Sequence, residues 1–265
     1  FIKGADRDLK NTYASRPSRT IMLSALGMTA LEKDLNYYTP EGGTKTALSQ
    51  MWQDSFKNTN TSSMSLAGWL LISRTGAYPE LKDGDKAAVE KRLLDIFDDK
   101  TGGWKNYSKL DIEYTAYAIM ALADAYEDSA NQNHQDAVQK INKAIATLKT
   151  NYTKTTELDD RCYIAMALMA LGEDPETVKV NGTGLISSFI PNLLADQTGF
   201  TDSIEKIKYS KDTTPTAILT LQMYKEFKAS GKRVSLNIKD TYPTEAKEAL
   251  KVALMEACEK DADDY

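Results

Sequence analysis

The chain has one dense group of carboxylates, in the sequence Glu157-Leu158-Asp159-Asp160. Carboxylates this close repel one another, and the repulsion can raise the pKa of one of them until it serves as an acid. Carboxylates also accept hydrogen bonds from the free N–H groups at the start of a helix, and an apolar helical segment begins at Arg161. Glu157, Asp159 and Asp160 are therefore candidate catalytic acids, but we favour the interpretation that Asp159 or Asp160 caps a helix.

Other recurrent catalytic motifs are absent from the sequence. It contains no Gly-Lys-Ser/Thr phosphate loop, no Gly-x-Ser-x-Gly nucleophile elbow and no paired-histidine motif. The single histidine, His134, excludes a multi-histidine metal site. The two cysteines, Cys162 and Cys258, lie too far apart in sequence to indicate a disulfide framework or a zinc finger.

The segments that must position these residues are of two kinds. Residues 115–123 and 162–171 are rich in Ala, Leu and Met and contain no charge, which is typical of a buried helix. Residues 88–97 and 134–149 place apolar residues at helical spacing on one side only. We predict buried inner helices that alternate with amphipathic outer helices. We expect no hairpin, because no Asn-Gly or Asp-Gly turn joins two strand-like runs.

The alternation repeats along the chain. Equivalent small residues fall roughly 50 residues apart, at Ala67, Ala116, Cys162 and Ala217, and residues 21–31 form a less regular earlier copy. Residues 99–104 and 196–200 end outer helices with glycine followed by an aromatic residue.

This pattern predicts an all-α fold, an (α/α)6 toroid of about six helical hairpins that forms a single domain over residues 1–265. The ring would close where residues 1–13 meet residues 243–260, and an open solenoid is the alternative.

The repeats resemble those of a known superfamily. Residues 93–104 and 189–200 are similar to the Gln…Gly-x-Trp/Phe repeats of squalene cyclases and protein prenyltransferase β subunits, the terpenoid cyclase-like toroids. The segments beginning at Tyr114 and Arg161 look like the inner helices of that group. The resemblance covers residues 63–227, and the tract 162–200 is most similar to non-catalytic surface proteins of Gram-positive bacteria and to cobalamin carriers.

The resemblance implies a non-catalytic ligand-binding or interaction domain of a bacterial surface or secreted protein. We accordingly expect an extracellular or cell-surface location, and a chain that is a piece of a longer protein with further domains. A cobalamin-type ligand is implied by the resemblance alone. A structural platform for protein–protein contacts is an alternative function.

The catalytic relatives suggest two further tests. Their cyclases protonate substrate with an Asp-x-Asp-Asp motif, from which residues 157–160 differ at one position, so a cyclase-like enzyme with acid Asp159 or Asp160 is an alternative. Their prenyltransferases bind zinc with an Asp and a Cys two residues apart, as in Asp160 and Cys162, and with a later His. Pro215 lies near the place of that His, so we expect no zinc and interpret Cys162 as a packed core residue.

The inner helices of a toroid begin at a common rim, where we place the ligand site. The predicted ligand is a small molecule, a glycan or a peptide, and we expect the largest pocket there. Asp111 or Glu113 could also pair with Asp159 or Asp212 as in glycosidases. We expect Trp69 and Tyr117 to fill the core and Tyr114 and Tyr163 to be exposed. The predicted rim residues are Trp69, Asp111, Glu113, Tyr114, Tyr117, Asp160, Arg161, Tyr163, Asp212 and Thr213.

Composition limits the partners. The net charge is -5 and the pI is about 5.2, with no basic stripe, which argues against nucleic acid. No segment of the chain reaches the roughly 20 apolar residues that a membrane-spanning helix needs.

Overall fold

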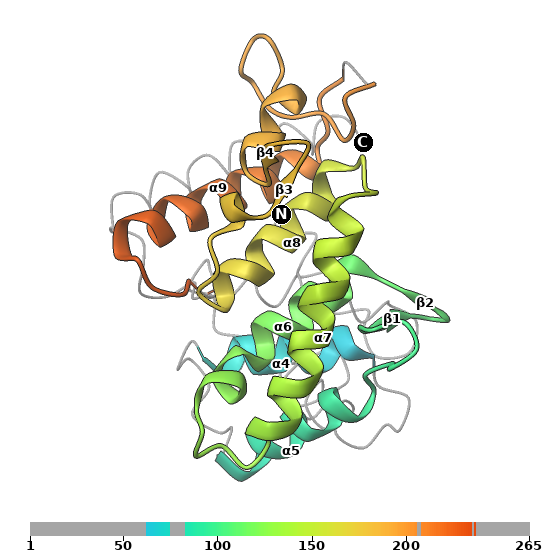
Figure 1. Cartoon of the computed structure of the whole chain (residues 1–265), viewed down its shortest axis with the longest axis vertical. Helices are drawn as coiled ribbons and strands as arrows, with labels where there is room; N and C mark the ends of the chain where they lie inside the picture. The colour runs from blue at the N-terminus through green and yellow to red at the C-terminus, as the bar shows by residue number, and fades with distance from the viewer. Residues whose placement is uncertain (1–61, 75–82, 206–207, 235, 237–265) are drawn as a thin grey trace, which may run out of the picture. The chain divides into compact units, whose positions relative to one another are not determined.

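The computed structural model describes residues 62–74, 83–205, 208–234 and 236 (Figure 1). Its contacts divide the chain into two compact units, Phe1–Val89 with Asn237–Tyr265, and Glu90–Leu236. The described residues are mainly helical, as predicted. The expected ring closure and the copy at residues 21–31 lie outside the described residues, so the toroid and the single domain stay predictions.

In the first unit the structure describes helix α4 (Ser63–Ser73). The apolar side chains that the structure describes in this helix are buried, including Met64, Leu70 and Trp69, the last 4% exposed. Trp69 is thus a core residue, as expected. The next helix, α5 (Asp83–Asp95), contains the boundary between the two units.

Three inner helices form the centre of the second unit. Helix α8 (Leu158–Ala170) packs between α6 (Ile112–Glu127) and α9 (Thr213–Ser230). Residues 114–123 and 161–170 are buried without interruption, which confirms the prediction of helices that are apolar all round. Helix α9 differs, because one side of it is exposed at Ile218.

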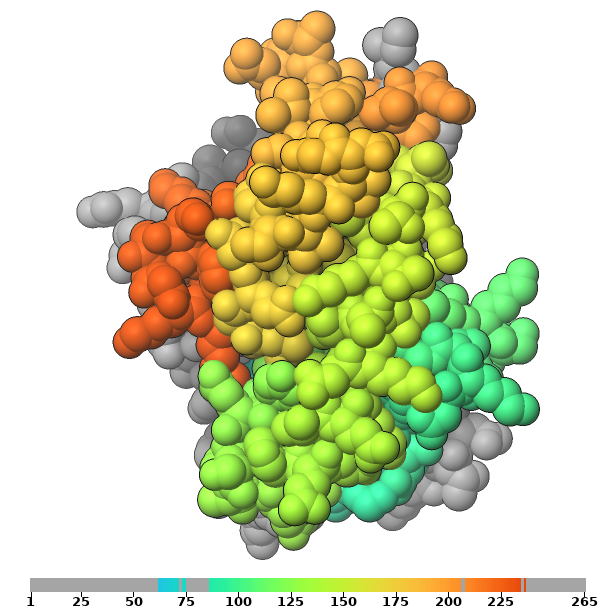
Figure 2. Space-filling model, in the orientation of Figure 1, coloured from blue at the N-terminus to red at the C-terminus, as the bar shows by residue number. Residues whose placement is uncertain are grey.

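Helix α7 (His134–Tyr152) is the predicted amphipathic outer helix. It packs on α6 and α8 through one stripe of side chains, among them Ile141, Ile145 and Leu148, and its other side is exposed (Figure 2). Asn142 and Lys143 lie on that exposed side. The helix therefore covers the junction between two inner helices.

The connection from α8 to α9 departs from the prediction of an outer helix near residues 189–200. It contains the 3-10 helices η2 (Pro175–Thr177) and η3 (Ser187–Asn192) and a hairpin of β3 (Lys179–Val180) and β4 (Thr183–Gly184). Pro191 lies inside η3, where it lacks the N–H that an α-helix would use.

The β3–β4 hairpin corrects the expectation that no Asn-Gly turn forms one. Asn181 and Gly182 make its two-residue turn, with φ angles of 51° and 82°. Positive φ at both positions is what the common two-residue hairpin turn requires, and Asn and Gly tolerate it best.

A second hairpin precedes α6. Its strands are β1 (Lys105–Asn106) and β2 (Lys109–Leu110), and it stands out from the body of the unit (Figure 1). Tyr107 forms its tip with a φ of 56° and a side chain that is 99% exposed.

Two glycine–aromatic turns dock on inner helices in the same way. The backbone N–H of Trp104 donates to Thr115 Oγ1 at 3.0 Å, and that hydroxyl donates to the carbonyl of Trp104 at 3.2 Å. Phe200 and Thr214 repeat this exchange at 2.9 and 3.2 Å. The sequence repeat therefore corresponds to a repeated contact between a turn and the first turn of an inner helix.

Candidate functional site

The N-terminal ends of α6 and α8 lie side by side, as predicted for the rim. Asp111 caps α6, with its Oδ1 accepting the N–H of Tyr114 at 3.0 Å. The hydroxyl of Tyr163, in the first turns of α8, donates to Glu113 Oε1 at 3.0 Å. This bond joins two predicted rim residues that are 50 positions apart in sequence.

The start of α9 joins the same rim. Thr213 Oγ1 donates to Asp202 Oδ1 at 2.7 Å, and the carbonyl of Asp202 accepts the N–H of Leu158 at 2.8 Å. The three inner helices are therefore parallel, with their N-terminal ends together. Asp202 was not among the predicted rim residues. We considered only residues at or near the start of each inner helix, and a loop separates Asp202 from the start of α9. Asp212 is exposed and makes no side-chain capping bond.

Two carboxyl groups at this rim have altered acidity. Burial raises the pKa of the Asp159 carboxyl from 3.8 to about 6; the nearby hydroxyl of Thr213 opposes this shift, and the charges of Asp202 and Glu113 add to it. Burial also raises the pKa of Asp160, against a 2.8 Å hydrogen bond from the hydroxyl of Thr155. The rim therefore holds a carboxyl, that of Asp159, which keeps its proton to a higher pH than an ordinary aspartate.

The capping interpretation of Asp159 and Asp160 is wrong in detail. Helix α8 begins at Leu158 rather than Arg161, and Glu157 occupies the capping position without a side-chain bond. Asp159 and Asp160 lie in the first turn, where the helix dipole favours negative charge. Asp159 Oδ1 is buried and has no hydrogen-bond partner among the described residues.

The tyrosines of the rim are buried. Tyr117 is buried as expected, but Tyr114 and Tyr163, predicted to be exposed, are only 9% and 7% exposed. The rings of Tyr117 and Tyr163 lie 5.9 Å apart, centroid to centroid. Tyr163 of α8 contacts Tyr117 and Glu113 of α6, a contact between helices that the sequence of one helix does not reveal.

Arg161 connects α8 to η3. Its guanidinium donates to Asn192 Oδ1 at 2.6 Å, to the carbonyl and hydroxyl of Ser188, and to the carbonyls of Thr156 and Glu157. These acceptors are all neutral oxygens, and burial lowers the pKa of Arg161. Arg161 is a buried structural bridge and not an exposed rim residue.

Cys162 is fully buried beside Arg161. Burial raises the pKa of its thiol, which disfavours the thiolate that a metal would need. Among the described residues, no three His, Cys, Asp or Glu side chains form a group able to hold a metal ion.

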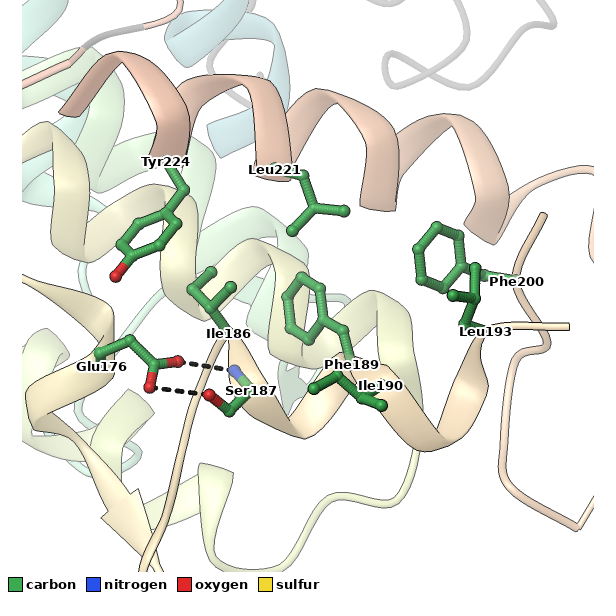
Figure 3. A pocket seen from close by; sticks show the side chains of 9 residues that line it. All are labelled: Glu176, Ile186, Ser187, Phe189, Ile190, Leu193, Phe200, Leu221 and Tyr224. Carbon is green, nitrogen blue, oxygen red and sulfur yellow. Dashed lines mark hydrogen bonds between the residues drawn. The ribbon is translucent and has the colours of Figure 1, made fainter. Parts of the chain in front are cut away.

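An apolar groove lies elsewhere, between η3 and α9 (Figure 3). It has a volume of about 430 Å³. Leu221 and Tyr224 point into it from α9, opposite Ile186 and Phe189 (Figure 3). None of the predicted rim residues lines it. The residues of the η3–α9 groove are Glu176, Ile186, Ser187, Phe189, Ile190, Leu193, Phe200, Leu221 and Tyr224.

Large aliphatic side chains at this groove are open to solvent. Ile190 is 70% exposed and Leu193 is 42% exposed; Ile218, one turn before Leu221 on α9, is 57% exposed. We did not predict this surface from the sequence. The available signal was the apolar content of residues 186–193, which we attributed to an outer helix that would have buried it.

The described helices do not include one long and apolar enough to cross a membrane. No family model matches the chain, and searches of curated proteins and of solved structures found no match either.

Proposed function

We propose that this chain is a non-catalytic interaction domain that binds a partner through the η3–α9 groove. The observation that carries the proposal is the exposed aliphatic surface that Ile190 and Leu193 form in an open apolar groove. Contiguous apolar surface on a soluble protein is characteristic of contact sites, because leaving it in water is unfavourable.

The chemistry of the groove favours a protein partner over a glycan or a cobalamin-type ligand. Its walls are aliphatic and aromatic, and its polar side chains are few, mainly Glu176, Ser187 and Tyr224. A glycan needs many hydrogen-bonding groups, whereas an apolar protein segment needs buried area and few polar contacts.

Dye binding tests this proposal. Anilinonaphthalene sulfonate fluoresces on exposed apolar surface, and we expect Ile190→Asp to remove most of its fluorescence with the native protein. Ile204, which is 61% exposed and outside the groove, supplies the matched control Ile204→Asp. Equal fluorescence losses in the two variants, or no loss in Ile190→Asp, would contradict the proposal.

We also propose that the described helices belong to an (α/α)6 toroid. The parallel arrangement of α6, α8 and α9 and the outer position of α7 support it. An extracellular or cell-surface location rests on the family resemblance alone. The proposal includes no zinc, so stoichiometric zinc that resists chelation in the purified protein would count against it.

Acid chemistry at the rim is the second candidate function. Its support is Asp159, whose pKa is raised to about 6 beside Glu113 and Asp202. It ranks second because the buried rings of Tyr117 and Tyr163 occupy the neighbouring space. Conversion of squalene that Asp159→Asn abolishes, detected by gas chromatography, would establish it.

A further inference from the structure

We propose that the η3–α9 groove receives an amphipathic helix of a partner protein, with a basic side chain of that helix opposite Glu176. This inference rests on the proposed function and specifies the partner of the same groove. Two independent features of the second unit support it, one of architecture and one of charge.

The architectural feature is the missing outer helix. Between α6 and α8, the amphipathic helix α7 covers the junction with Ile141, Ile145 and Leu148. Between α8 and α9, the connection supplies the short helix η3 and a hairpin instead. Leu221 of α9 therefore lines the groove half-buried, and Ile218, one turn before it, is exposed.

The spacing of three apolar or aromatic side chains along α9, one exposed and two half-buried, fits a helix. Ile218, Leu221 and Tyr224 follow one another at intervals of one helical turn along α9. They extend over about 9 Å, given a rise of about 1.5 Å per residue. A partner helix presents its apolar residues at positions i, i+3 or i+4, and i+7 over a similar length.

The charge feature is Glu176, at the end of the groove beside Tyr224 (Figure 3). Its carboxylate accepts the N–H of Ser187 at 2.6 Å and the hydroxyl of Ser187 at 3.0 Å. A carboxylate can accept about four hydrogen bonds, so Glu176 can accept further hydrogen bonds from a ligand. Among the described residues no basic side chain pairs with Glu176, and the nearby Lys228 pairs with Asp174 at 3.0 Å. A lysine or arginine of the partner complements this charge.

The test uses a fluorescein-labelled peptide with the sequence of α7, His134–Tyr152, and the full chain. This peptide is amphipathic and contains three lysines, Lys140, Lys143 and Lys149. We expect saturable binding by fluorescence anisotropy, at least about tenfold weaker binding to Ile190→Asp, and unchanged binding to Ile204→Asp. Circular dichroism melts confirm that the variants are folded.

Two peptide variants distinguish the contribution of helix formation to binding from the contribution of positive charge. A peptide with Ala144→Pro cannot form the helix and should not bind. Glu176→Gln should weaken binding of the lysine peptide about two- to fivefold, with no effect on a peptide in which the three lysines are glutamine. Glu205→Gln, an exposed site outside the groove, is the matched control.

Each of the other possible results rejects the helix inference, the proposed function, or both. If the dye result holds but the peptide does not bind, or the proline peptide binds equally well, the helix inference fails while the proposed groove stands. If the dye does not respond to Ile190→Asp, the proposed function fails as well. A monomer–dimer equilibrium that Ile190→Asp abolishes in sedimentation experiments would assign the groove to a second copy and overturn the inference.

Discussion

Single residues at the rim link burial to acidity. Asp159 lies in the first turn of α8 with one carboxyl oxygen buried and without a hydrogen-bond partner among the described residues. Burial favours its protonated form, and the neighbouring carboxylates of Glu113 and Asp202 act in the same direction. The helix dipole opposes them but is weaker than full desolvation.

This balance predicts a pH-dependent effect of Asp159→Asn. The native state binds an additional proton between the ordinary pKa of 3.8 and about 6, so the stability from protonated Asp159 is present below about pH 4 and lost as the pH rises through 6. We expect Asp159→Asn to match the parent protein at about pH 4 and to be more stable by about 1 kcal/mol at about pH 7.5, allowing for solvent screening. Urea unfolding at both pH values measures this difference. A variant that is less stable at the higher pH would refute the assignment.

The Arg161 bridge predicts a large loss of stability when the guanidinium is removed. Arg161→Met keeps much of the apolar stem but leaves the oxygens of Asn192 and Ser188 without their donor. We expect a loss of about 2–4 kcal/mol in the free energy of unfolding. Lys179→Met, at an exposed position in β3, is the control and should change stability by less than about 0.5 kcal/mol. Similar values for the two variants would show that the bridge is unimportant.

At the scale of elements, each glycine–aromatic turn depends on one threonine hydroxyl. Thr115→Val removes the acceptor for the buried N–H of Trp104, whereas Thr115→Ser keeps it. We expect a loss of about 1–3 kcal/mol for the valine variant, since a buried donor is left unsatisfied, and a smaller loss for the serine variant. The pair Thr214→Val and Thr214→Ser should repeat the result at Phe200. Equal losses for valine and serine would show that the hydroxyl bond is not the cause.

Some elements could be predicted from the sequence and others could not, for physical reasons. Helices α6 and α8 have charge-free runs, and α7 has a one-sided stripe, so each has a clear periodicity. The strands of the β3–β4 hairpin have two residues each, which is too short for alternation to be recognised. Near η3, the glycine and aromatic residue at 196–200 suggested the end of an outer α-helix, but Pro191 and two serines favour a shorter turn.

The rim and the η3–α9 groove also differ in how far they could be predicted from the sequence. The rim could be predicted because parallel inner helices necessarily bring their first turns together, as Tyr163 and Glu113 show. The burial of Tyr114 could not be predicted from the sequence, because it depends on how neighbouring helices pack. The groove joins residues from Glu176 to Tyr224 that share no sequence period, so only the folded arrangement identifies it.

At the scale of the whole molecule, the contacts of the second unit predict independent folding. Its core is formed by α6, α8 and α9, with α7 packed on α6 and α8, and all four lie within Glu90–Leu236. We expect residues 83–236, which keep α5 intact, to show helical circular dichroism and a cooperative urea transition. A broad transition without a cooperative midpoint would show that the second unit needs the rest of the chain.

The fully exposed Tyr107 makes the β1–β2 hairpin a place for engineering the molecule. The paired strands hold the two sides of the tip close together, so a short peptide tag inserted after Tyr107 begins and ends at nearly the same point. Asp111, which caps α6 and also binds Asn106 at 3.2 Å, lies beyond the insertion. We expect the tagged protein to keep its unfolding free energy within about 0.5 kcal/mol, as measured in urea. A fluorophore on that tag would give an optical signal from the neighbourhood of the rim without altering any rim residue.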